Sequence, residues 1–145
     1  MDGYHKCIEV RWSDLDPNFH MTHSKYYDLG AYIRMCFFVE NGITPHELHA
    51  HRLGPILLRE ECVFRREIRL GDKVTINLQV LKAKKDYSRW TIQHTVTKNG
   101  DIVSAIITVD GAWLDTTKRK LAVPPTKILE TFSQMPMSEN FQWLD

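Results

Sequence analysis

Two aspartates and two histidines lie close together in the polar segment between residues 13 and 24. Asp14 and Asp16 are separated by one residue, and His20 and His23 follow within seven residues of Asp16. A carboxylate can attack a carbonyl carbon or take a proton from water, and a nearby imidazole can orient the reacting group. An aspartate directly after a strand is more often a turn residue, which is our interpretation of Asp14. The segment is therefore a candidate for nucleophilic or general-base chemistry.

The same side chains could instead be metal ligands. Asp16, His20 and His23 form one candidate group, and a second group consists of His46, His49 and His51. Zinc usually requires three or four converging ligands, and neither group has a recognised ligand spacing. We therefore expect no metal site and no cofactor.

Composition restricts the class of protein. The chain has 145 residues, of which 43% are hydrophobic and 26% charged, which suits one globular domain over residues 1–145. A net charge of +1 provides no global field for nucleic acid or an anionic membrane, so we expect neither partner. Charges interrupt the first ten residues, where a signal peptide needs an apolar run, and Cys7, Cys36 and Cys62 indicate no disulfide framework. These features predict a soluble cytoplasmic protein.

A strand and a long helix are expected on either side of the polar segment. Residues 4–12 largely alternate between apolar and polar types, which predicts a strand with one buried face. A helix is expected over residues 25–41, with Thr22 and Ser24 as candidate N-terminal caps. Apolar residues occupy nearly its whole circumference, so it should be surrounded by protein. A second, short helix is expected over residues 44–51.

The rest of the chain predicts an antiparallel sheet. β-Branched and aromatic residues dominate four segments, which are residues 56–68, 73–84, 87–98 and 102–114. Short turns separate them, and the pair Asn99-Gly100 is a strong hairpin signal. The tail from about residue 128 is expected to be a short helix with a loose end, or partly disordered.

This order of elements predicts an α+β fold in which a curved antiparallel sheet of about five strands surrounds one long central helix. One sheet cannot cover such a helix on every side. We therefore expect a homo-oligomer, either a dimer or a tetramer, that buries an edge or a face of each subunit.

The polar segment and the start of the expected helix resemble the opening signature of hotdog-fold thioesterases of the 4-hydroxybenzoyl-CoA thioesterase type. The residues concerned are Arg11-Trp-Ser-Asp14-Leu-Asp16-Pro-Asn-Phe-His20-Met-Thr-His23-Ser-Lys-Tyr26, with Arg34 two turns farther along. A weaker likeness is found at Leu70-Gly71-Asp72, which looks like the family's turn before a long hairpin. With this turn included, the resemblance extends across nearly the whole domain. The resemblance implies a hotdog fold and hydrolysis of an acyl-CoA thioester. In the family members most like this loop, the second Asp of the Asp-x-Asp pattern is catalytic and some have a His seven residues later, which implies these roles for Asp16 and His23.

The sequence departs from the family pattern at several positions. It has Phe19 where the family commonly has Gly, and it has Thr22 and His23 about where the family commonly has Asn or Tyr. Phe19 is expected to narrow the acyl pocket or to alter the loop. Ala31 stands where the family commonly has an acid on the helix, which excludes any mechanism that needs a carboxylate at that position.

Thioester hydrolysis requires an activated nucleophile and stabilisation of charge on the carbonyl oxygen. The leaving thiol has a pKa of about 8.5, so the thiolate departs without strong need of an acid. Asp16 would act as nucleophile or general base, with His23 orienting water or the thioester. Unpaired N–H groups near His23, Ser24 and Lys25, at the start of the helix, would polarise the carbonyl. Contacts with the substrate are expected from His20, Ser24 and Tyr26.

A basic turn between two of the expected strands lies where the resembled family contacts the nucleotide of coenzyme A. Its candidate phosphate ligands are Lys84, Lys85, Ser88 and Arg89, with Lys82 beside them. Basic hairpin tips are also common as solvated features. The expected partner is an acyl-CoA, with an acyl-carrier-protein thioester as the alternative.

Two other functions are compatible with the sequence. Phe19 and Ala31 favour a hotdog module that binds an acyl thioester or a protein without catalysis. A hotdog dehydratase is a third interpretation, which would require a His and an acid arranged for proton abstraction. Thiol release from a panel of CoA esters separates hydrolysis from binding, and hydration of a crotonyl thioester would reveal a dehydratase.

Overall fold

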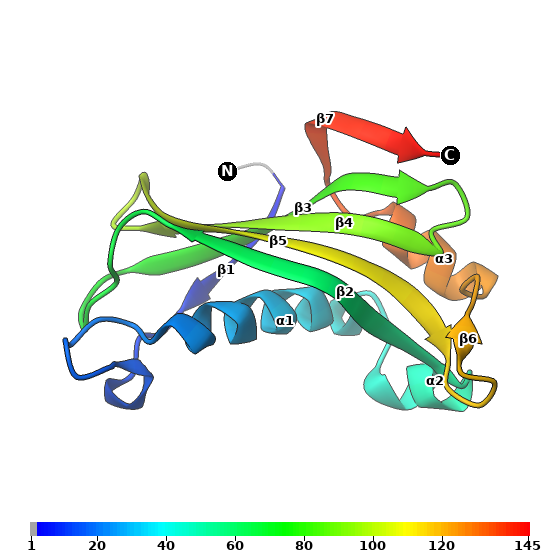
Figure 1. Cartoon of the computed structure of the whole chain (residues 1–145), viewed down its shortest axis with the longest axis horizontal. Coiled ribbons are helices and arrows are strands. Elements are labelled where there is room, and N and C mark those ends of the chain that lie inside the picture. Colours follow the sequence, from blue (N-terminus) through cyan, green and yellow to red (C-terminus); the bar gives the residue numbers. More distant parts are fainter. Residues whose placement is uncertain (1–2) are drawn as a thin grey trace.

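In the computed structural model, which describes residues 3–145, a curled β-sheet lies over one long helix (Figure 1). The elements, in chain order, are β1 (Tyr4–Ile8), the short 3-10 helix η1 (Trp12–Asp14), α1 (His23–Glu40), α2 (Pro45–Ala50), β2 (Leu53–Phe64), β3 (Val74–Lys84), β4 (Arg89–Lys98), β5 (Ile102–Asp115), β6 (Lys120–Leu121), α3 (Thr126–Ser133) and β7 (Met137–Leu144). The expected strand and two helices, and the four strands after them, are confirmed with shifted ends.

The main path of the sheet has the order β1-β3-β4-β5-β2, and every neighbouring pair along it is antiparallel. Two further strands join this path, so the expectation of about five strands is low by two. β6 pairs with the end of β5, and β7 runs parallel to β3. β1 and β7 share the outer edge of β3, because β1 pairs with residues 74–78 and β7 pairs with residues 80–84.

The period-two alternation of the central strands explains which face of the sheet is buried. In β3, Val74, Ile76, Leu78 and Val80 are buried, and the residues between them are only partly buried. This alternation is expected when one face packs on a core and the other meets solvent. Register shifts near residues 58 and 81 mark irregularities of the bulge type, which increase the local bend of a strand.

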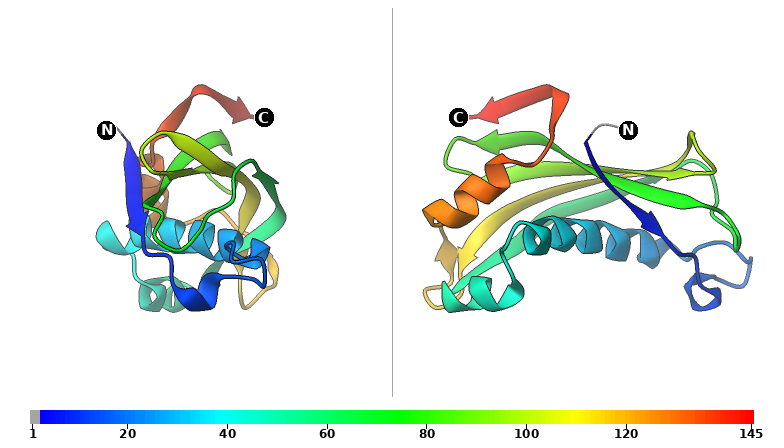
Figure 2. Two further views of the ribbon diagram at one scale, coloured as in Figure 1. Left: turned by 90° about the vertical axis from the view of Figure 1, so that its left-hand side faces the viewer. Right: turned by 180° about the vertical axis from the view of Figure 1, so that it is seen from behind.

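α1 lies along the inner face of the curled sheet, as the views in Figures 1 and 2 agree. Its residues Tyr26, Ile33 and Phe37 are buried, whereas Tyr32 and Val39 are 53% and 47% exposed. One chain therefore covers only part of the helix surface. The near-continuous apolar circumference predicted a helix enclosed by protein, and within one chain that enclosure is incomplete.

The C-terminal tail corrects a prediction. Of the two alternatives for the segment after residue 128, the short helix is present as α3, but the end after it is the strand β7 and not a loose end. Phe132 of α3 is 1% exposed and packs against Trp90 and Trp113, with ring centroids 5.7 and 6.4 Å apart. The N–H of Val80 donates to the carbonyl of Pro136 at 2.8 Å, which starts the pairing of β7. Distant aromatic partners and a free strand edge thus order the tail.

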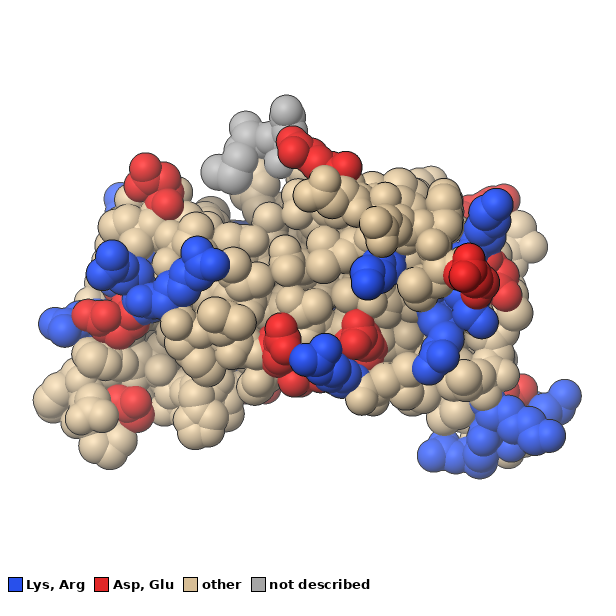
Figure 3. All heavy atoms as spheres, turned by 45° about the horizontal axis from the view of Figure 1, so that its top comes forward, with Lys and Arg blue, Asp and Glu red and all other residues tan. Residues whose placement is uncertain are grey.

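The surface carries charges of both signs. On the face drawn in Figure 3, acidic and basic side chains are interspersed, in keeping with the net charge of +1. Within residues 3–145, none of the helices has the length and apolar character needed to cross a bilayer.

Candidate active site

The loop between β1 and α1 is anchored by Asp14, whose side chain is buried. Its carboxylate accepts hydrogen bonds from the Arg11 N–H at 3.0 Å and from Arg11 Nη2 at 3.3 Å, and Lys25 Nζ lies 3.8 Å away. Burial by itself raises the pKa of this carboxyl, but the hydrogen bonds and charge of Arg11, with the charge of Lys25, outweigh burial and lower it. Both carboxylate oxygens are thus engaged within the protein, which supports the structural interpretation of Asp14.

Asp16 has a different environment two residues later. Its Oδ1 accepts hydrogen bonds from the N–H groups of Asn18 at 2.9 Å and His20 at 3.2 Å. The N–H of Asp16 donates to the His20 carbonyl at 2.8 Å, which closes the turn. Oδ2 makes no hydrogen bond to residues 3–145. One carboxylate oxygen is therefore fixed by the loop and the other is available.

The turn is completed by Phe19, whose φ of +64° lies in the left-handed region that glycine adopts without strain. This is the position where the resembled family commonly has Gly, so the loop keeps the backbone shape typical of glycine. The Phe19 ring is 61% exposed and lies near Trp12, with ring centroids 6.0 Å apart. Phe19 therefore points away from the core, and it is not among the residues that line the cleft beside Asp16.

Asp16 lies in an open cleft of about 310 Å³ between this loop, the start of α1 and the end of β2. The N–H of Met21 donates to the carbonyl of Ile68 at 2.8 Å, which ties the loop to the segment after β2. The cleft is lined by Asp16, His20, Met21, His23, Tyr26, Phe64, Arg65, Arg66 and Glu67. Four of the residues predicted from the sequence are thus brought together here: Asp16, His20, His23 and Tyr26.

The start of α1 opens toward the same cleft. Thr22 occupies the N-cap position, but its side chain makes no capping hydrogen bond, so it does not satisfy the first helical N–H groups. The N–H of Lys25 donates to the Thr22 carbonyl at 3.0 Å, which removes it from the expected donors. The N–H groups of His23 and Ser24 remain as donors in the first turn. The exposed side chain of Ser24 does not line the cleft.

Tyr26 forms the inner wall of the cleft and is 3% exposed. Its ring meets Phe64 edge to face, with ring centroids 5.0 Å apart. Burial raises the pKa of the Tyr26 phenol to about 12, and the charges of Cys62, Glu67 and Asp16 add to the effect. The phenol therefore stays protonated near neutral pH, and it can donate a hydrogen bond but cannot act as a base.

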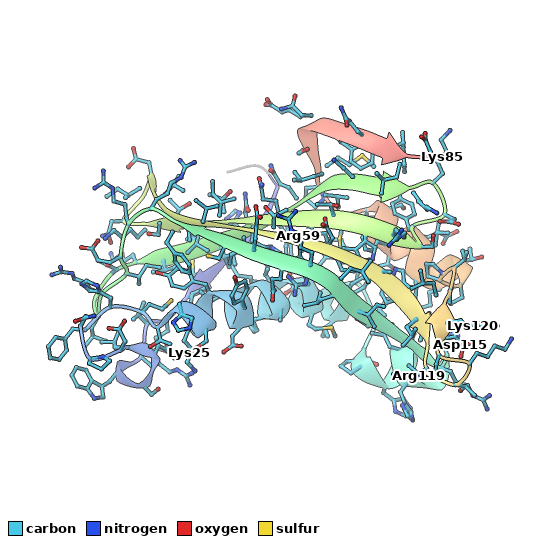
Figure 4. All side chains as sticks on the ribbon, in the orientation of Figure 1. Lys25, Arg59, Lys85, Asp115, Arg119 and Lys120 are labelled. Carbon is cyan, nitrogen blue, oxygen red and sulfur yellow. The ribbon has the colours of Figure 1, made fainter. Side chains whose placement is uncertain are left out.

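The predicted phosphate ligands lie elsewhere. Lys84 is the last residue of β3 and Lys85 follows it in the turn before β4, and Figure 4 shows Lys85 at the opposite end of the molecule from Lys25. The 18 residues of α1 alone extend about 27 Å along this axis. Ser88 N and Oγ donate to Asp86 Oδ1 at 2.9 and 2.6 Å, so this side chain is engaged in the turn. One chain therefore does not bring the basic turn, including Arg89 at the start of β4, to Asp16.

Two arginines in the cleft were missed by the sequence reasoning. Arg65 and Arg66 follow β2 directly, and both of their N–H groups donate to the Ser104 carbonyl, at 2.8 and 3.1 Å. Their side chains are exposed and line the cleft beside Asp16. The available signal in the sequence was a pair of adjacent arginines at the end of an apolar strand. This signal did not indicate that the pair would lie opposite the loop that contains Asp16. Among the described residues, no cluster of three His, Cys, Asp or Glu side chains is arranged to hold a metal ion.

Comparison with known proteins gives a consistent assignment. Residues 10–132 match the profile of the thioesterase-like superfamily. No protein with a curated description matches the sequence.

Solved structures share the fold over nearly the whole chain. A hypothetical protein from Staphylococcus aureus in complex with CoA is 20% identical, with a TM-score of 0.82 over 94% of this chain and 88% of that one. A 1,4-dihydroxy-2-naphthoyl-CoA thioesterase from Synechocystis is 12% identical, with a TM-score of 0.81 over 92% and 97%. A thioesterase from Thermus thermophilus, complexed with coenzyme A and Zn, is 26% identical, with a TM-score of 0.73 over 90% and 93%. The resemblance to hotdog-fold thioesterases is thereby confirmed.

Proposed function

Because the chain belongs to the thioesterase-like superfamily, we propose that it hydrolyses acyl-CoA thioesters and that Asp16 is the catalytic carboxylate. The observation that carries this proposal is the position of Asp16. Its carboxylate lies in the same cleft as His23 and the start of α1, with one oxygen held by the loop and the other without a hydrogen-bond partner in residues 3–145. A thioester carbonyl in this cleft would meet both an available carboxylate oxygen and helix N–H donors.

The chemistry requires little more than these groups. Asp16 Oδ2 either attacks the thioester carbonyl, which forms a mixed anhydride that water then cleaves, or takes a proton from the attacking water. The N–H groups of His23 and Ser24 would stabilise the negative charge that develops on the carbonyl oxygen. The C–S bond breaks with release of a thiolate, and the acyl group leaves as a free acid. The His23 imidazole would orient the water or the thioester.

The nucleotide end of coenzyme A carries phosphates, which arginine binds well because its planar guanidinium forms paired hydrogen bonds. Arg65 and Arg66 lie in the same cleft as Asp16, so we assign the first phosphate contacts to them. Lys84 and Lys85 would contribute only from a second subunit, because Lys85 lies at the far end of the same chain and Lys84 directly precedes it.

A homodimer built on β2 would provide this arrangement. β2 ends the sheet, pairs only with β5 within residues 3–145, and is 12 residues long. Leu57, Val63 and Phe64 of this strand are exposed. A long exposed apolar edge is a ready site for pairing with another strand. Antiparallel pairing of two β2 strands about a twofold axis would bring the Asp16 end of one subunit beside the basic-turn end of the other.

One observation favours a second candidate, a module that binds acyl thioesters without hydrolysing them. Asp16 Oδ1 accepts two loop N–H groups, as the side chain of a purely structural turn residue would. An acyl-carrier-protein thioester, in place of acyl-CoA, is the alternative substrate for the catalytic interpretation.

A panel of short-chain, long-chain and aryl CoA esters, assayed for free thiol, tests the proposal. We expect Asp16→Asn to lower turnover of the best ester by roughly 10²- to 10⁴-fold without changing the melting temperature. Asp101→Asn, in the exposed turn before β5, is the matched control and should retain full activity. Equal activity in Asp16→Asn would remove this residue from the mechanism. Binding of the esters without thiol release from any of them would support the second candidate, and a monomeric native mass would contradict the β2 dimer.

A further inference from the structure

A second cavity, of about 180 Å³, lies between the middle of α1 and the sheet and does not include Asp16. Its walls come from five elements, which are α1, α3 and the strands β2, β4 and β5. The lining residues are Ala31, Arg34, Met35, Phe38, Pro55, Leu57, Trp90, Ile92, Trp113 and Phe132. All of these except Arg34 are apolar or aromatic. The cavity is therefore suited to a hydrophobic group, and its one charge requires an explanation.

Arg34 is 9% exposed and has an unusual partner. Its Nη1 lies 2.9 Å from Nε2 of His94, which is fully buried, and His94 Nδ1 lies 2.9 Å from the Asn77 carbonyl. A carbonyl oxygen only accepts hydrogen bonds and a guanidinium only donates them. His94 therefore donates from Nδ1 to the Asn77 carbonyl and accepts at Nε2 from Arg34. Burial lowers the pKa of His94 to about 3, and the charge of Arg34 contributes. His94 is therefore neutral and cannot compensate the charge of Arg34.

No carboxylate of residues 3–145 lies within 4.0 Å of the Arg34 guanidinium. Burial lowers the pKa of the Arg34 guanidinium. The negative charge of Glu60, in β2, raises this pKa, but by less than burial lowers it. A buried charge without a paired partner is costly, and proteins usually avoid it. The chain nevertheless makes room for Arg34, because a Cβ at Gly30 would lie 3.1 Å from both Arg34 Nη1 and His94 Cδ2.

Two tryptophans contribute their rings to the lining. Trp90 and Trp113 are 3% and 0% exposed, and the indole N–H of each is buried without a hydrogen-bond acceptor anywhere in the described chain. Buried N–H groups are normally paired. The cavity thus combines an apolar surface with one guanidinium, and its lining residues include no acidic side chain.

We propose that this cavity receives an acyl group that ends in a carboxylate, with the carboxylate paired to Arg34. The proposal rests on the thioesterase function proposed above and names its substrate class as a short dicarboxylic monothioester. The size agrees, because a cavity of about 150 Å³ is large enough for a benzene ring. A chain of about six carbons, or one ring, therefore fills the space.

The proposed dimer connects this cavity to the cleft beside Asp16. Pro55 and Leu57 line the cavity from the first half of β2, and Phe64 lines the cleft from its last residue. Antiparallel pairing of two β2 strands sets the first half of one strand against the last part of the other. The acyl group would then occupy the cavity of one subunit while its thioester carbonyl faces Asp16 of the second.

Adipoyl-CoA and hexanoyl-CoA provide a matched pair of probes, because their acyl groups differ only in a terminal carboxylate or methyl. We expect wild-type protein to prefer adipoyl-CoA by at least about tenfold in kcat/KM. Arg34→Met should abolish or reverse this preference, and Arg34→Lys should keep part of it. Ala31→Glu, which adds an acid three residues before Arg34 on the same helix, should also reduce it by occupying the guanidinium. Arg119→Met, in an exposed turn, is the matched control and should leave the preference for adipoyl-CoA unchanged.

A wild-type preference of one or less, or a preference that Arg34→Met leaves intact, would overturn the inference while leaving thioester hydrolysis in place. If neither ester releases thiol, the dissociation constants of the same two esters, measured by calorimetry, provide the same comparison. The hydrolytic proposal then fails, but tighter binding of adipoyl-CoA that depends on Arg34 still supports the cavity assignment. If Arg34→Met does not fold, Arg34→Lys and Ala31→Glu make the test, and an unchanged preference in both would overturn the inference.

Discussion

The two ends of α1 are surrounded by different kinds of residue. Its first turn is exposed at His23 and Ser24, lacks a side-chain cap, and borders an open polar cleft that contains Asp16. Its last turns are packed into an aromatic cluster, in which Phe38 meets Trp113 and Phe132 with ring centroids 5.8 and 6.2 Å apart. One helix thus provides unsatisfied donors at one end and much of the hydrophobic stabilisation at the other. Substitutions near its start should change rates, and substitutions near its end should change stability.

The largest effect on stability is expected at Phe38. Phe38→Ala removes a ring that is 4% exposed and leaves a cavity among aromatic neighbours. Such truncations cost about 3–5 kcal/mol of unfolding free energy. Val39→Ala, at the next position but 47% exposed, is the matched control and should stay within about 0.5 kcal/mol of wild type. Denaturant unfolding measures both, and similar losses in the two variants would break the contrast between the two ends of the helix.

Asp14→Asn tests whether Asp14 has a structural role in the loop before α1, in contrast to the catalytic role proposed for Asp16. Removing a buried, hydrogen-bonded charge should cost about 1–3 kcal/mol at pH 7. Because the folded state lowers the pKa of Asp14, its contribution is present above the ordinary carboxyl pKa and is lost as pH falls through the lowered value. Stability of the variant should therefore depend less on pH in the acid range. Thermal unfolding that is unchanged at pH 7, with activity lost, would exchange the roles of Asp14 and Asp16.

His23→Ala sharpens the assignment of the first turn to catalysis. The imidazole is exposed and lines the cleft, and the N-cap position of the helix belongs to Thr22 rather than to His23. We expect about a tenfold loss of turnover. The melting temperature should remain near that of wild type, and circular dichroism with thiol-release kinetics measures both effects. Loss of folding without a specific loss of rate would instead assign His23 to helix capping.

The smallest expected effect is a gain in stability at Phe19. Its φ of +64° is strained for a residue with a side chain, and glycine relieves that strain. Relief of this strain should raise the free energy of unfolding of Phe19→Gly by about 1 kcal/mol. Two effects reduce the gain, which are loss of the ring contact with Trp12 and the larger conformational entropy that glycine gives the unfolded chain. Asn18→Gly, in the same turn, is the control without positive φ and should not stabilise. Destabilisation by Phe19→Gly would show that the exposed ring contributes more than its backbone strain costs.

Local patterns predicted most of the framework. The alternation of β3, the apolar circumference of α1 and the Asn99-Gly100 turn each depend on neighbouring residues, and each prediction was close to the observed element. The tail was predicted poorly, because β7 alternates weakly and is ordered by the free edge of β3 rather than by its own propensity. The residues that line the cleft from the loop were predicted. Arg65 and Arg66, which line it from the other side, were missed because they lie more than forty residues after Asp16 in the chain.

The sequence by itself determined the order of the main strands and the first two helices and the grouping of Asp16, His20 and His23 around the start of α1, because these depend on spacing along the chain. Only the tertiary structure decided that both carboxylate oxygens of Asp14 are engaged while Asp16 keeps one oxygen without a partner in residues 3–145, and that the basic turn at Lys85 lies at the other end of the molecule. It alone brought Arg34 to His94, sixty residues apart, beside an apolar cavity. Burial and charge compensation depend on which distant segments pack together, and no local pattern specifies that.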